Sequence, residues 1–509
     1  MQFHLKFLLS LLGLVLLSRL GLSALVPFMD TTEPRYAEIA RLMAVSGDWI
    51  TPWFREGVPF WGKPPLSFWA QALSFRWLGI SEFAGRLPSW LANLAIVILV
   101  MRTRAAFLPD SGSALFSHET VWAALIYSTM LLGFLSAGTV MTDSFLALGT
   151  TLALGSVLIR LQGGNATWGW LLFVGLAIGL LAKGPLTLVL TGLPVAAWVI
   201  VHQQWRALRQ NFPWIRGTGL MLALTVPWYV LAEIKTPGFL DYFIVGEHFK
   251  RFLISDWNGD LYGNAHEFPR GTIWLHLILA SFPWGLIGAV ACIRRYHRGS
   301  RLLHHWQGTH KGITGLVLMS ALTPAVFFSL SGNILWTYVL PGLPFLGIIL
   351  SALIPLNRIS DHRRASLAPA LMVPLLGIGL GLWSTANPEH LETEKTLVRE
   401  IRNHPQWELE DLVYTGEIPF SARFYSSARV HSMPRSTLLS RLDSVAQPTP
   451  QLVSVERDDE ALIKKLESMA EPVTQSKEYI VFPVGRASGE TRQAGDPVGC
   501  RSWSESSCS

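Results

Sequence analysis

The chain has 509 residues, of which 50% are hydrophobic and only 15% are charged, and its mean hydropathy is +0.35. Soluble globular proteins carry about 25% charged residues, so this composition excludes an ordinary soluble protein and indicates that lipid is the solvent. The formal net charge of +6 does not indicate a nucleic-acid partner, because the basic residues cluster in short gaps between apolar runs.

The first apolar run covers about residues 7–27, with one lysine upstream and no small-residue cleavage site before Asp30. This pattern predicts a retained membrane helix and not a cleaved signal peptide. A span needs roughly 20 apolar residues, and the whole chain then predicts about 11–13 transmembrane helices. The runs that we assign as spans are 7–27, 86–104, 119–138, 141–160, 168–182, 184–202, 213–233, 272–293, 312–331, 335–355 and 366–386.

The gaps between successive runs differ in their content of basic residues. The gaps near 139–142 and 332–336 hold no Lys or Arg, whereas the alternate gaps are rich in arginine. Because cytoplasmic loops are enriched in Lys and Arg, this asymmetry predicts a cytoplasmic N-terminus. The long loops 28–85 and 234–271, and everything after about residue 387, are then expected on the extracytoplasmic side.

The chain changes character after its last apolar run. Charge density rises, and short strand-like and helix-like segments replace the long apolar runs. We expect a membrane domain over 1–386, a small α/β domain over 387–485 and a disordered tail over 486–509, which is rich in Gly, Ser and Arg. The strand-like segments are 411–414, 451–455 and 479–482, and the helix-like segment is 459–469.

The first outer loop begins with a polar, helix-initiating segment. Thr32, Glu33 and Pro34 are typical of a helix start. The apolar residues that follow lie on one face of a helix, with Glu38 and Arg41 on another, which predicts an amphipathic helix on the membrane surface. The carboxylate of Asp30 precedes this helix, either as an interfacial cap or as a functional group. The apolar face consists of Tyr36, Ile39, Ala40 and Met43.

Lys63 is followed by two prolines in the same loop. The prolines stiffen the backbone around the lysine, so that its ammonium group is well placed to bind a lipid phosphate at the interface. A simple turn between surface helices explains the same pattern.

Three further outer segments carry groups that could take part in chemistry. Thr142-Asp143 opens a span and could act as a helix N-cap. The second outer loop holds Glu247, His248 and Arg251, which could bind a metal or a phosphate, or could form a solvated charged loop. Tyr338 is expected at headgroup depth.

In their order along the chain, these segments resemble those of one enzyme group, the aminoarabinose lipid A transferases and related undecaprenyl-phosphate-sugar glycosyltransferases. The protein O-mannosyltransferases are similar but more distant. The likeness covers most of residues 1–355 and also a segment around Tyr414–Tyr425. The segments are Asp30…Glu33-Pro-Arg-Tyr-Ala-Glu38, Lys63-Pro-Pro-Leu, Thr142-Asp143, Glu247-His248-Phe…Arg251-Phe and Tyr338-Val-Leu-Pro.

The resemblance implies a GT-C fold, with surface helices in the first outer loop and an active site at the outer face of a bacterial inner membrane. The implied donor is a sugar on a polyprenyl phosphate, and the acceptor is a lipid, such as lipid A, or a protein. It places the catalytic aspartate at Asp30 and a second functional aspartate at Asp143. The donor-phosphate residues are Lys63, Arg251 and Tyr338, with Glu33, Arg35 and Glu38 in support.

A divalent metal is the one cofactor that the resemblance suggests, since His248 matches a histidine linked to a bound metal in the aminoarabinose enzymes. The sequence departs from those enzymes at Gly62, where they carry a carboxylate before the lysine. A polyprenyl-phosphate donor needs no nucleotide, in agreement with a sequence that has no Gly-rich phosphate-binding loop.

The chemistry fits these residues. Lys63 and Arg251 can stabilise the charge on the departing phosphate, and Asp30 can accept a proton from a hydroxyl acceptor. A phosphate acceptor would need no base, and in either case the sugar centre would invert.

A lipid or polysaccharide transporter is the main alternative, but transporters usually carry ionisable groups near the bilayer centre, whereas these candidates cluster at one interface. A polysaccharide polymerase or ligase is closer in chemistry and stays open. A membrane sensor with an extracytoplasmic domain does not explain the charged residues of the first outer loop.

Overall fold

The computed structural model describes residues 5–108, 115–254, 257, 259–263, 268–297, 312–354, 367–442 and 451–485. The chain forms two compact units, Met1–Thr393 and Glu394–Ser509. The sequence placed the change of character at 386/387, seven residues before the boundary between these units. The expected disordered tail, 486–509, lies outside the described residues.

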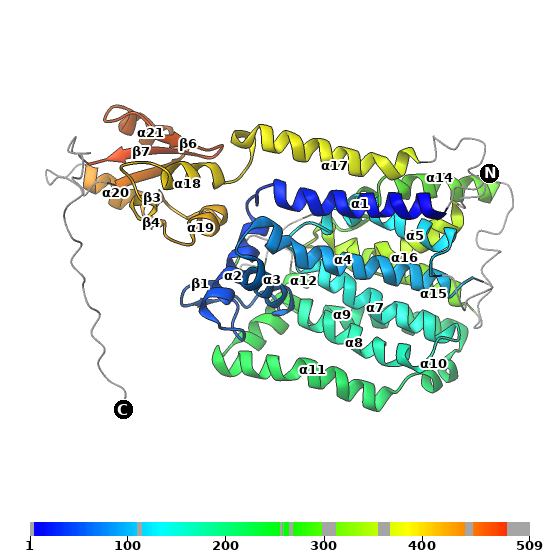
Figure 1. Ribbon diagram of the computed structural model, residues 1–509. Coiled ribbons are helices and arrows are strands. Elements are labelled where there is room, and N and C mark those ends of the chain that lie inside the picture. Colours follow the sequence, from blue (N-terminus) through cyan, green and yellow to red (C-terminus); the bar gives the residue numbers. More distant parts are fainter. Residues whose placement is uncertain are drawn as a thin grey trace. The chain divides into compact units, whose positions relative to one another are not determined.

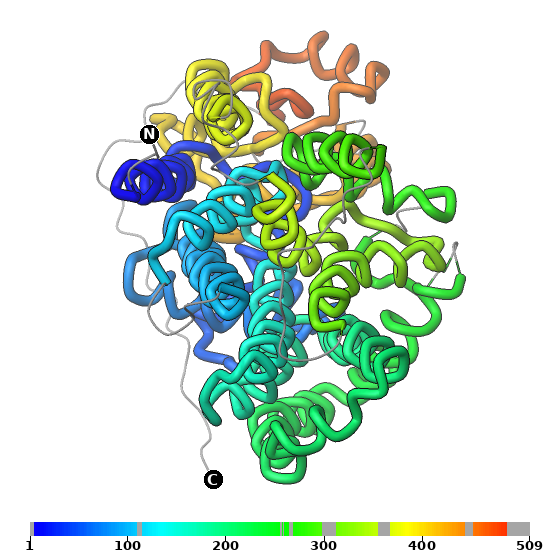
Figure 2. The backbone as a smooth tube through the Cα atoms, turned by 90° about the vertical axis from the view of Figure 1, so that its right-hand side faces the viewer, coloured from blue at the N-terminus to red at the C-terminus, as the bar shows by residue number. Residues whose placement is uncertain are grey.

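Unit 1 is a bundle of long apolar helices (Figure 1). Among the described residues, seven helices are long and apolar enough to cross a membrane. Seen end-on, the helices pack beside one another around a common core (Figure 2). The spans are α1 (Leu5–Leu25), α4 (Glu82–Ala105), α7 (Asp143–Leu161), α8 (Ala166–Lys183), α11 (Trp214–Lys235), Trp336–Leu353, which joins η2 (Trp336–Gly342) and α16 (Leu343–Leu353), and α17 (Ala368–Ala386).

Each of the other four expected spans also holds helix, but in a shorter or broken form. α13 (Ile273–Ala280) and α14 (Trp284–His297) bend by 101° at their junction and count as an eighth span if taken together. α9 (Leu186–His202) and α15 (Ile313–Phe328) are shorter apolar helices. The run 119–138 is divided into α5 (His118–Ser128) and α6 (Leu131–Ser136).

The two breaks satisfy each other's polar groups. The Leu131 amide at the α5–α6 break donates to the Phe282 carbonyl oxygen at the α13–α14 break, at 2.9 Å. The Trp284 indole N–H donates to the Thr129 hydroxyl at 2.8 Å. Non-helical backbone is tolerated at membrane depth only where such partners exist. Hydropathy therefore predicts the runs but not their interruptions.

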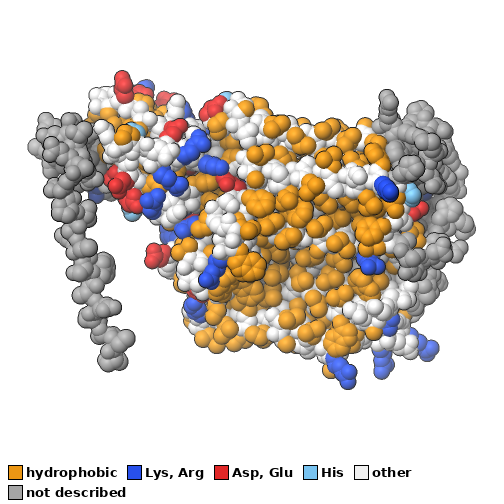
Figure 3. Space-filling view, in the orientation of Figure 1, with side chains coloured by type: hydrophobic (Ala, Val, Ile, Leu, Met, Phe, Trp, Pro, Cys, Tyr) orange, Lys and Arg blue, Asp and Glu red, His pale blue; other side chains and the backbone are white. Residues whose placement is uncertain are grey.

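Close backbone packing holds the centre of the bundle. A Cβ added at Gly149 of α7 would lie 2.6 Å from the Gly179 amide nitrogen of α8, and one added at Gly175 would lie 2.5 Å from the Ala153 amide nitrogen. Small residues at such contacts let membrane helices approach closely. On the outer surface of unit 1, hydrophobic side chains cover most of the flank that Figure 3 shows, as lipid contact requires.

The first outer loop forms two helices and a hairpin, as the resemblance implies for its helices. α2 (Thr32–Ser46) ends at Gly47, whose φ of 73° suits glycine, and α3 (Leu66–Leu78) follows the antiparallel strands β1 (Trp53–Arg55) and β2 (Val58–Pro59).

The apolar face expected for α2 is buried, but its other face is not a solvent face. Glu38 is 2% exposed and Arg41 is 6% exposed, and they form an ion pair with atoms 2.6 Å apart. The prediction of an amphipathic surface helix was wrong here, because neighbouring segments cover both sides of α2. A charge pattern along one helix does not reveal what packs against it.

The remaining helices of unit 1 connect these elements: α10 (Trp205–Asn211), α12 (Arg251–Leu253), the π-helix η1 (Asp241–Lys250) and η4 (Pro388–His390).

Unit 2 is a small α/β domain around a five-stranded sheet of order β4-β3-β5-β7-β6. β3 pairs in parallel with β4 and β5, whereas β7 runs antiparallel to β5 and β6. Separate apolar clusters on the two faces, one around Tyr414 and one around Phe482, form its core. The elements are α18 (Lys395–Arg402), η5 (Leu409–Asp411), β3 (Leu412–Thr415), α19 (Phe420–Ser426), β4 (His431–Met433), α20 (Arg435–Leu442), β5 (Gln451–Glu456), α21 (Glu460–Glu467), β6 (Thr474–Gln475) and β7 (Tyr479–Val484).

The three expected strands correspond to β3, β5 and β7, and the expected helix corresponds to α21. The fold class, a helical polytopic membrane protein with a small α/β domain, is therefore confirmed.

Candidate active site

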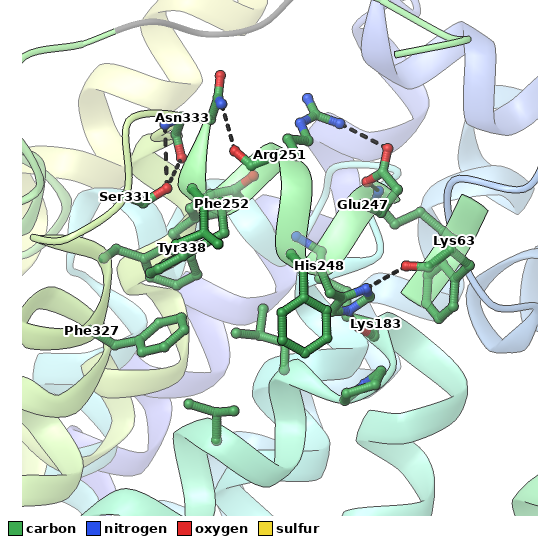
Figure 4. Close-up of a pocket in the computed structure, with 17 residues that line it drawn as sticks. Lys63, Lys183, Glu247, His248, Arg251, Phe252, Phe327, Ser331, Asn333 and Tyr338 are labelled. Atoms are coloured by element: carbon green, nitrogen blue, oxygen red, sulfur yellow. Dashed lines mark hydrogen bonds and ion pairs between the residues drawn. The ribbon is translucent and has the colours of Figure 1, made fainter. Parts of the chain in front are cut away.

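A cavity of about 480 Å³ lies in unit 1 where the second outer loop meets the ends of several helices. One side carries charged and polar groups and the other is lined by aromatic and aliphatic side chains (Figure 4). The polar side is formed by Lys63, Lys183, Glu247, His248, Arg251, Ser331, Asn333 and Tyr338. Five of these residues were site candidates from the sequence: Lys63, Glu247, His248, Arg251 and Tyr338.

Glu247 bridges the two cations expected to bind phosphate. Its carboxylate oxygens lie 2.9 Å from Lys63 Nζ and 3.0 Å from Arg251 Nη1. Arg251 Nη1 also lies 3.2 Å from the carboxylate of Asp260. We call these four residues, Lys63, Glu247, Arg251 and Asp260, the cavity cluster. The alternative that Glu247, His248 and Arg251 form a solvated loop was wrong, because all three line a partly closed cavity.

Within the cavity cluster, the neighbouring charges shift the pKa values of Glu247 and Arg251. Burial by itself would raise the pKa of Glu247, but Lys63 and Arg251 more than offset this and hold that pKa at about 2. Burial would likewise lower the pKa of Arg251, and the carboxylate of Glu247 instead raises it. Both groups therefore carry full charges at physiological pH.

A second ion pair lies in the wall of the cavity. Lys183 Nζ, at the end of α8, lies 2.6 Å from the Asp143 carboxylate at the start of α7, and both side chains are largely buried. Lys183 Nζ also lies 4.9 Å from the centre of the Tyr338 ring. In the described part of the chain, the Thr142 side chain makes no helix-capping hydrogen bond. The N-cap interpretation of this dipeptide was wrong, since Asp143 binds the lysine.

Lys183 is one of three polar cavity residues that the sequence analysis missed, together with Ser331 and Asn333. It lies between two of the assigned runs, 168–182 and 184–202, and was given no role. A lysine at the end of an otherwise apolar run is costly in lipid, and this was the available signal of a functional site. Its partner lies 40 positions earlier, a separation that no local pattern reveals.

Asn333 holds the arginine of the cavity cluster in place through the backbone. Its side-chain amide donates to the Arg251 carbonyl at 2.6 Å and to the Ile254 carbonyl at 3.2 Å, at the end of α12. Tyr338 lies nearby, with its ring 4.5 Å from that of Phe328.

His248 does not have the surroundings of a metal ligand. Its Nδ1 lies 2.7 Å from the Phe243 carbonyl oxygen and its Nε2 lies 3.0 Å from the Lys183 carbonyl oxygen. Burial lowers the pKa of the ring. A Cβ added at Gly62 would lie 2.9 Å from the ring of Phe60, so a carboxylate there requires that ring to move. The described residues contain no group of three metal-binding side chains. The suggested metal does not fit these residues, and no step below depends on one.

Glu33, at the start of α2, forms a buried anchor with Arg86 of α4. The guanidinium binds both carboxylate oxygens, at 3.0 and 2.6 Å, and Glu33 also accepts the Val140 amide at 2.8 Å. Arg35 donates to the Tyr262 carbonyl at 2.6 Å and so ties α2 to the second outer loop. Glu33, Arg35 and Glu38 therefore fix the position of α2 and are not among the residues that line the described cavity.

Asp30 is also absent from the described lining of the cavity. It lies between α1 and α2, its side chain is partly exposed, and its amide donates to the Glu392 carbonyl oxygen at 2.9 Å. Its assignment as the catalytic aspartate stays a prediction.

The apolar side of the cavity opens toward the surface of unit 1. Phe252 stacks on Phe327 with ring centres 4.8 Å apart. Phe249 is 59% exposed and Leu253 is 67% exposed, although both line the cavity. A site with buried charges at one end and an exposed apolar wall at the other suits an amphiphile with an anionic headgroup.

Comparison with known proteins agrees with this arrangement. The family model described as dolichyl-phosphate-mannose-protein mannosyltransferase matches residues 6–243. An undecaprenyl phosphate-alpha-4-amino-4-deoxy-L-arabinose arabinosyl transferase of Edwardsiella ictaluri is 28% identical over 477 residues, 90% of this chain and 78% of that one. The transferase of the same name from Pseudomonas paraeruginosa is 27% identical over 405 residues, 76% of this chain and 66% of that one.

The fold has a solved counterpart. The crystal structure of ArnT from Cupriavidus metallidurans bound to undecaprenyl phosphate covers 94% of this chain and 98% of its own, with a TM-score of 0.73 at 17% identity. That likeness shows a shared GT-C-like fold, and the family match and the long alignments make the chain similar to the aminoarabinose transferases and, more distantly, to the protein mannosyltransferases.

Proposed function

We propose that the protein transfers a sugar from a polyprenyl phosphate, such as undecaprenyl phosphate, to lipid A or another glycolipid at the extracytoplasmic face of the inner membrane. The observation that carries this proposal is the cavity, which places the cations Lys63 and Arg251 beside an apolar wall. The phosphate would lie between these cations and Tyr338, and the polyprenyl chain would lie along Phe252 and Leu253. Relatives whose names specify an undecaprenyl-phosphate donor support this assignment.

The transfer needs stabilisation of a leaving group. The bond between the anomeric carbon and the phosphate oxygen breaks, its electron pair stays on that oxygen, and an acceptor oxygen bonds to the opposite face of the carbon. The phosphate thereby changes from a monoanionic diester to a monoester that carries more negative charge. Lys63 and Arg251, fixed in a site of low dielectric, stabilise the added charge without reorganising. The displacement inverts the sugar centre.

The two aspartates have different tasks in this proposal. Asp143 holds Lys183 at the cavity wall and is a positioning residue. Asp30 accepts the proton when the acceptor is a hydroxyl group, and no base is needed when the acceptor is a phosphate group already ionised. A protein is the alternative acceptor, because the family model that matches residues 6–243 is described as a protein mannosyltransferase.

Reconstitution tests the proposal directly. Purified protein in lipid nanodiscs is given undecaprenyl-phosphate aminoarabinose and lipid A, and the products are identified by mass spectrometry. Lipids from cells with and without the protein are compared in parallel, so that another glycolipid acceptor would also be found. Sugar transfer that depends on the protein supports the proposal. Absence of any protein-dependent glycolipid or glycoprotein, from an enzyme that is folded and purified, would contradict it.

The orientation is tested separately with an impermeant thiol reagent, in a variant whose native cysteines are replaced by serine. Glu56→Cys, at the turn of the outer hairpin, should react in intact cells. Arg209→Cys, in α10, should react only after permeabilisation. The reverse result would place the cavity on the cytoplasmic side and overturn the assignment of the acceptor.

A further inference from the structure

One carboxylate occupies the position between the two cations that would bind the donor phosphate. Glu247 is the only side chain in the described part of the cavity cluster that contacts both Lys63 and Arg251. Its side chain is 7% exposed, and it projects from the π-helix η1, a type of helix that is rare and often marks functional sites. A buried carboxylate at the centre of an anion site needs an explanation.

Each of the two cations uses part of its hydrogen-bonding capacity on Glu247. Lys63 Nζ donates to Glu247 and, at 2.5 Å, to the Gly62 carbonyl oxygen, which leaves one of its three protons. Arg251 Nη1 binds Glu247 and Asp260, while its buried Nε has no hydrogen-bond partner among the described residues. A phosphate that binds both cations must therefore share them with Glu247 or displace it.

The charge on the phosphate increases during the reaction, and this increase affects the competition between Glu247 and phosphate for the two cations. The donor phosphodiester carries one negative charge, whereas the polyprenyl phosphate product is a monoester that carries up to two. Two unopposed cations would hold the product more strongly than the donor, because ion pairing and charge-assisted hydrogen bonds strengthen with charge. Product that leaves slowly limits turnover.

We propose that Glu247 is a positioning residue that holds Lys63 and Arg251 before the donor binds and competes with the polyprenyl phosphate product for them, so that the product is released. Its carboxylate keeps the two cations together, where mutual repulsion would otherwise separate them. After transfer its carboxylate returns to both cations as the product leaves. This inference rests on the proposed function, because it presumes that the phosphate binds at these cations.

The proposal predicts the sign of a change in binding. Glu247→Gln keeps the size of the side chain and removes its charge. Undecaprenyl phosphate should then bind roughly 5- to 30-fold more tightly, by competition with a fluorescent polyprenyl phosphate in nanodiscs. Multiple-turnover kcat should fall and product inhibition should strengthen by a similar factor, while the single-turnover rate falls much less. A merely structural role predicts the opposite sign, weaker binding of the product.

Controls separate this inference from the proposed function. Asp459→Asn neutralises an arginine-paired carboxylate in unit 2 and should leave undecaprenyl phosphate binding unchanged. If Glu247→Gln does not fold, Glu247→Ala is measured in its place, with the same expected sign. Unchanged or weaker binding in a folded variant overturns the role of Glu247, whereas a wild-type protein that neither binds undecaprenyl phosphate nor transfers sugar overturns the proposed function itself.

Discussion

The anchor between Glu33 and Arg86 and the cavity cluster around Glu247 are both buried sets of charges, but they differ in how completely their donors are used. Arg86 places its guanidinium nitrogens on Glu33 and on the carbonyl oxygens of Ser23, Val26 and Pro27. Arg251 has a buried nitrogen with no hydrogen-bond partner among the described residues, beside an open cavity. A saturated arginine fixes the fold, whereas an incompletely bonded one can receive a ligand.

The substitution of Asp30 gives the largest expected effect. It tests whether this residue belongs to the catalytic site or only to the structure around the anchor. Asp30 lies three residues before the anchor, and Asp30→Asn removes charge and basicity while keeping size. If Asp30 is the base for a hydroxyl acceptor, turnover should fall roughly 100- to 10,000-fold, and the acid limb of the pH–rate profile should disappear. Steady-state kinetics between pH 5 and 9 make the measurement.

The pH profile also distinguishes the acceptor. With a phosphate acceptor, Asp30→Asn can still lose activity through misplacement, but the residual rate keeps the wild-type pH profile. Full activity at every pH would show that Asp30 is an interfacial cap and would move the catalytic centre elsewhere.

Breaking the anchor should cost stability and not chemistry. Arg86→Ala leaves the Glu33 carboxylate buried without its cation, which typically destabilises a protein by about 3–5 kcal/mol. We expect a large loss of folded protein in detergent, followed by thermal melting with a tryptophan signal, and a near-normal KM for the molecules that remain folded. Stable Arg86→Ala protein with an altered KM would mean that the anchor belongs to the binding site.

Lys63→Ala tests the cavity cluster, where we expect a loss of donor binding and not a loss of stability. Loss of a charge-assisted hydrogen bond to phosphate should lower kcat/KM roughly 10- to 150-fold, with little change in melting temperature. Lys235→Ala is the matched control, because Lys235 also pairs with an outer-loop carboxylate, Asp48 at 2.6 Å, but does not line the described cavity. Equal effects of the two variants would contradict a phosphate site at Lys63.

The membrane helices were predictable from the sequence because their signal is local. Each apolar run that was assigned as a span holds helix, because lipid imposes a length and a composition that are visible locally. The order of short polar segments predicted Lys63, Glu247, Arg251 and Tyr338, which the fold brings to one cavity.

What the sequence did not reveal depends on partners far along the chain. The Asp143–Lys183 pair, the burial of Glu38 with Arg41 and the two mutually bonded helix breaks all arise from tertiary contacts. Glu33 was predicted as a supporting residue, but its partner Arg86 was not, because the two are 53 positions apart. Charge and spacing identify candidates, and only packing separates anchors from sites.

Acid pH gives the smallest expected effect, and it tests the charge state on which the cavity cluster depends. The folded-state pKa of Glu247, about 2, lies below its ordinary value of 4.5. A depressed carboxylate pKa contributes stability that is fully present above the unfolded pKa and is lost as pH falls toward the folded pKa. The stability difference between the wild-type protein and Glu247→Gln should therefore stay constant from pH 8 to pH 5.5 and shrink only below about pH 4.5. Thermal melting of both proteins across this range measures it. If the stability difference already changes between pH 7 and pH 5.5, Glu247 titrates near neutrality. Its carboxylate would then not carry the full charge that the competition with phosphate requires.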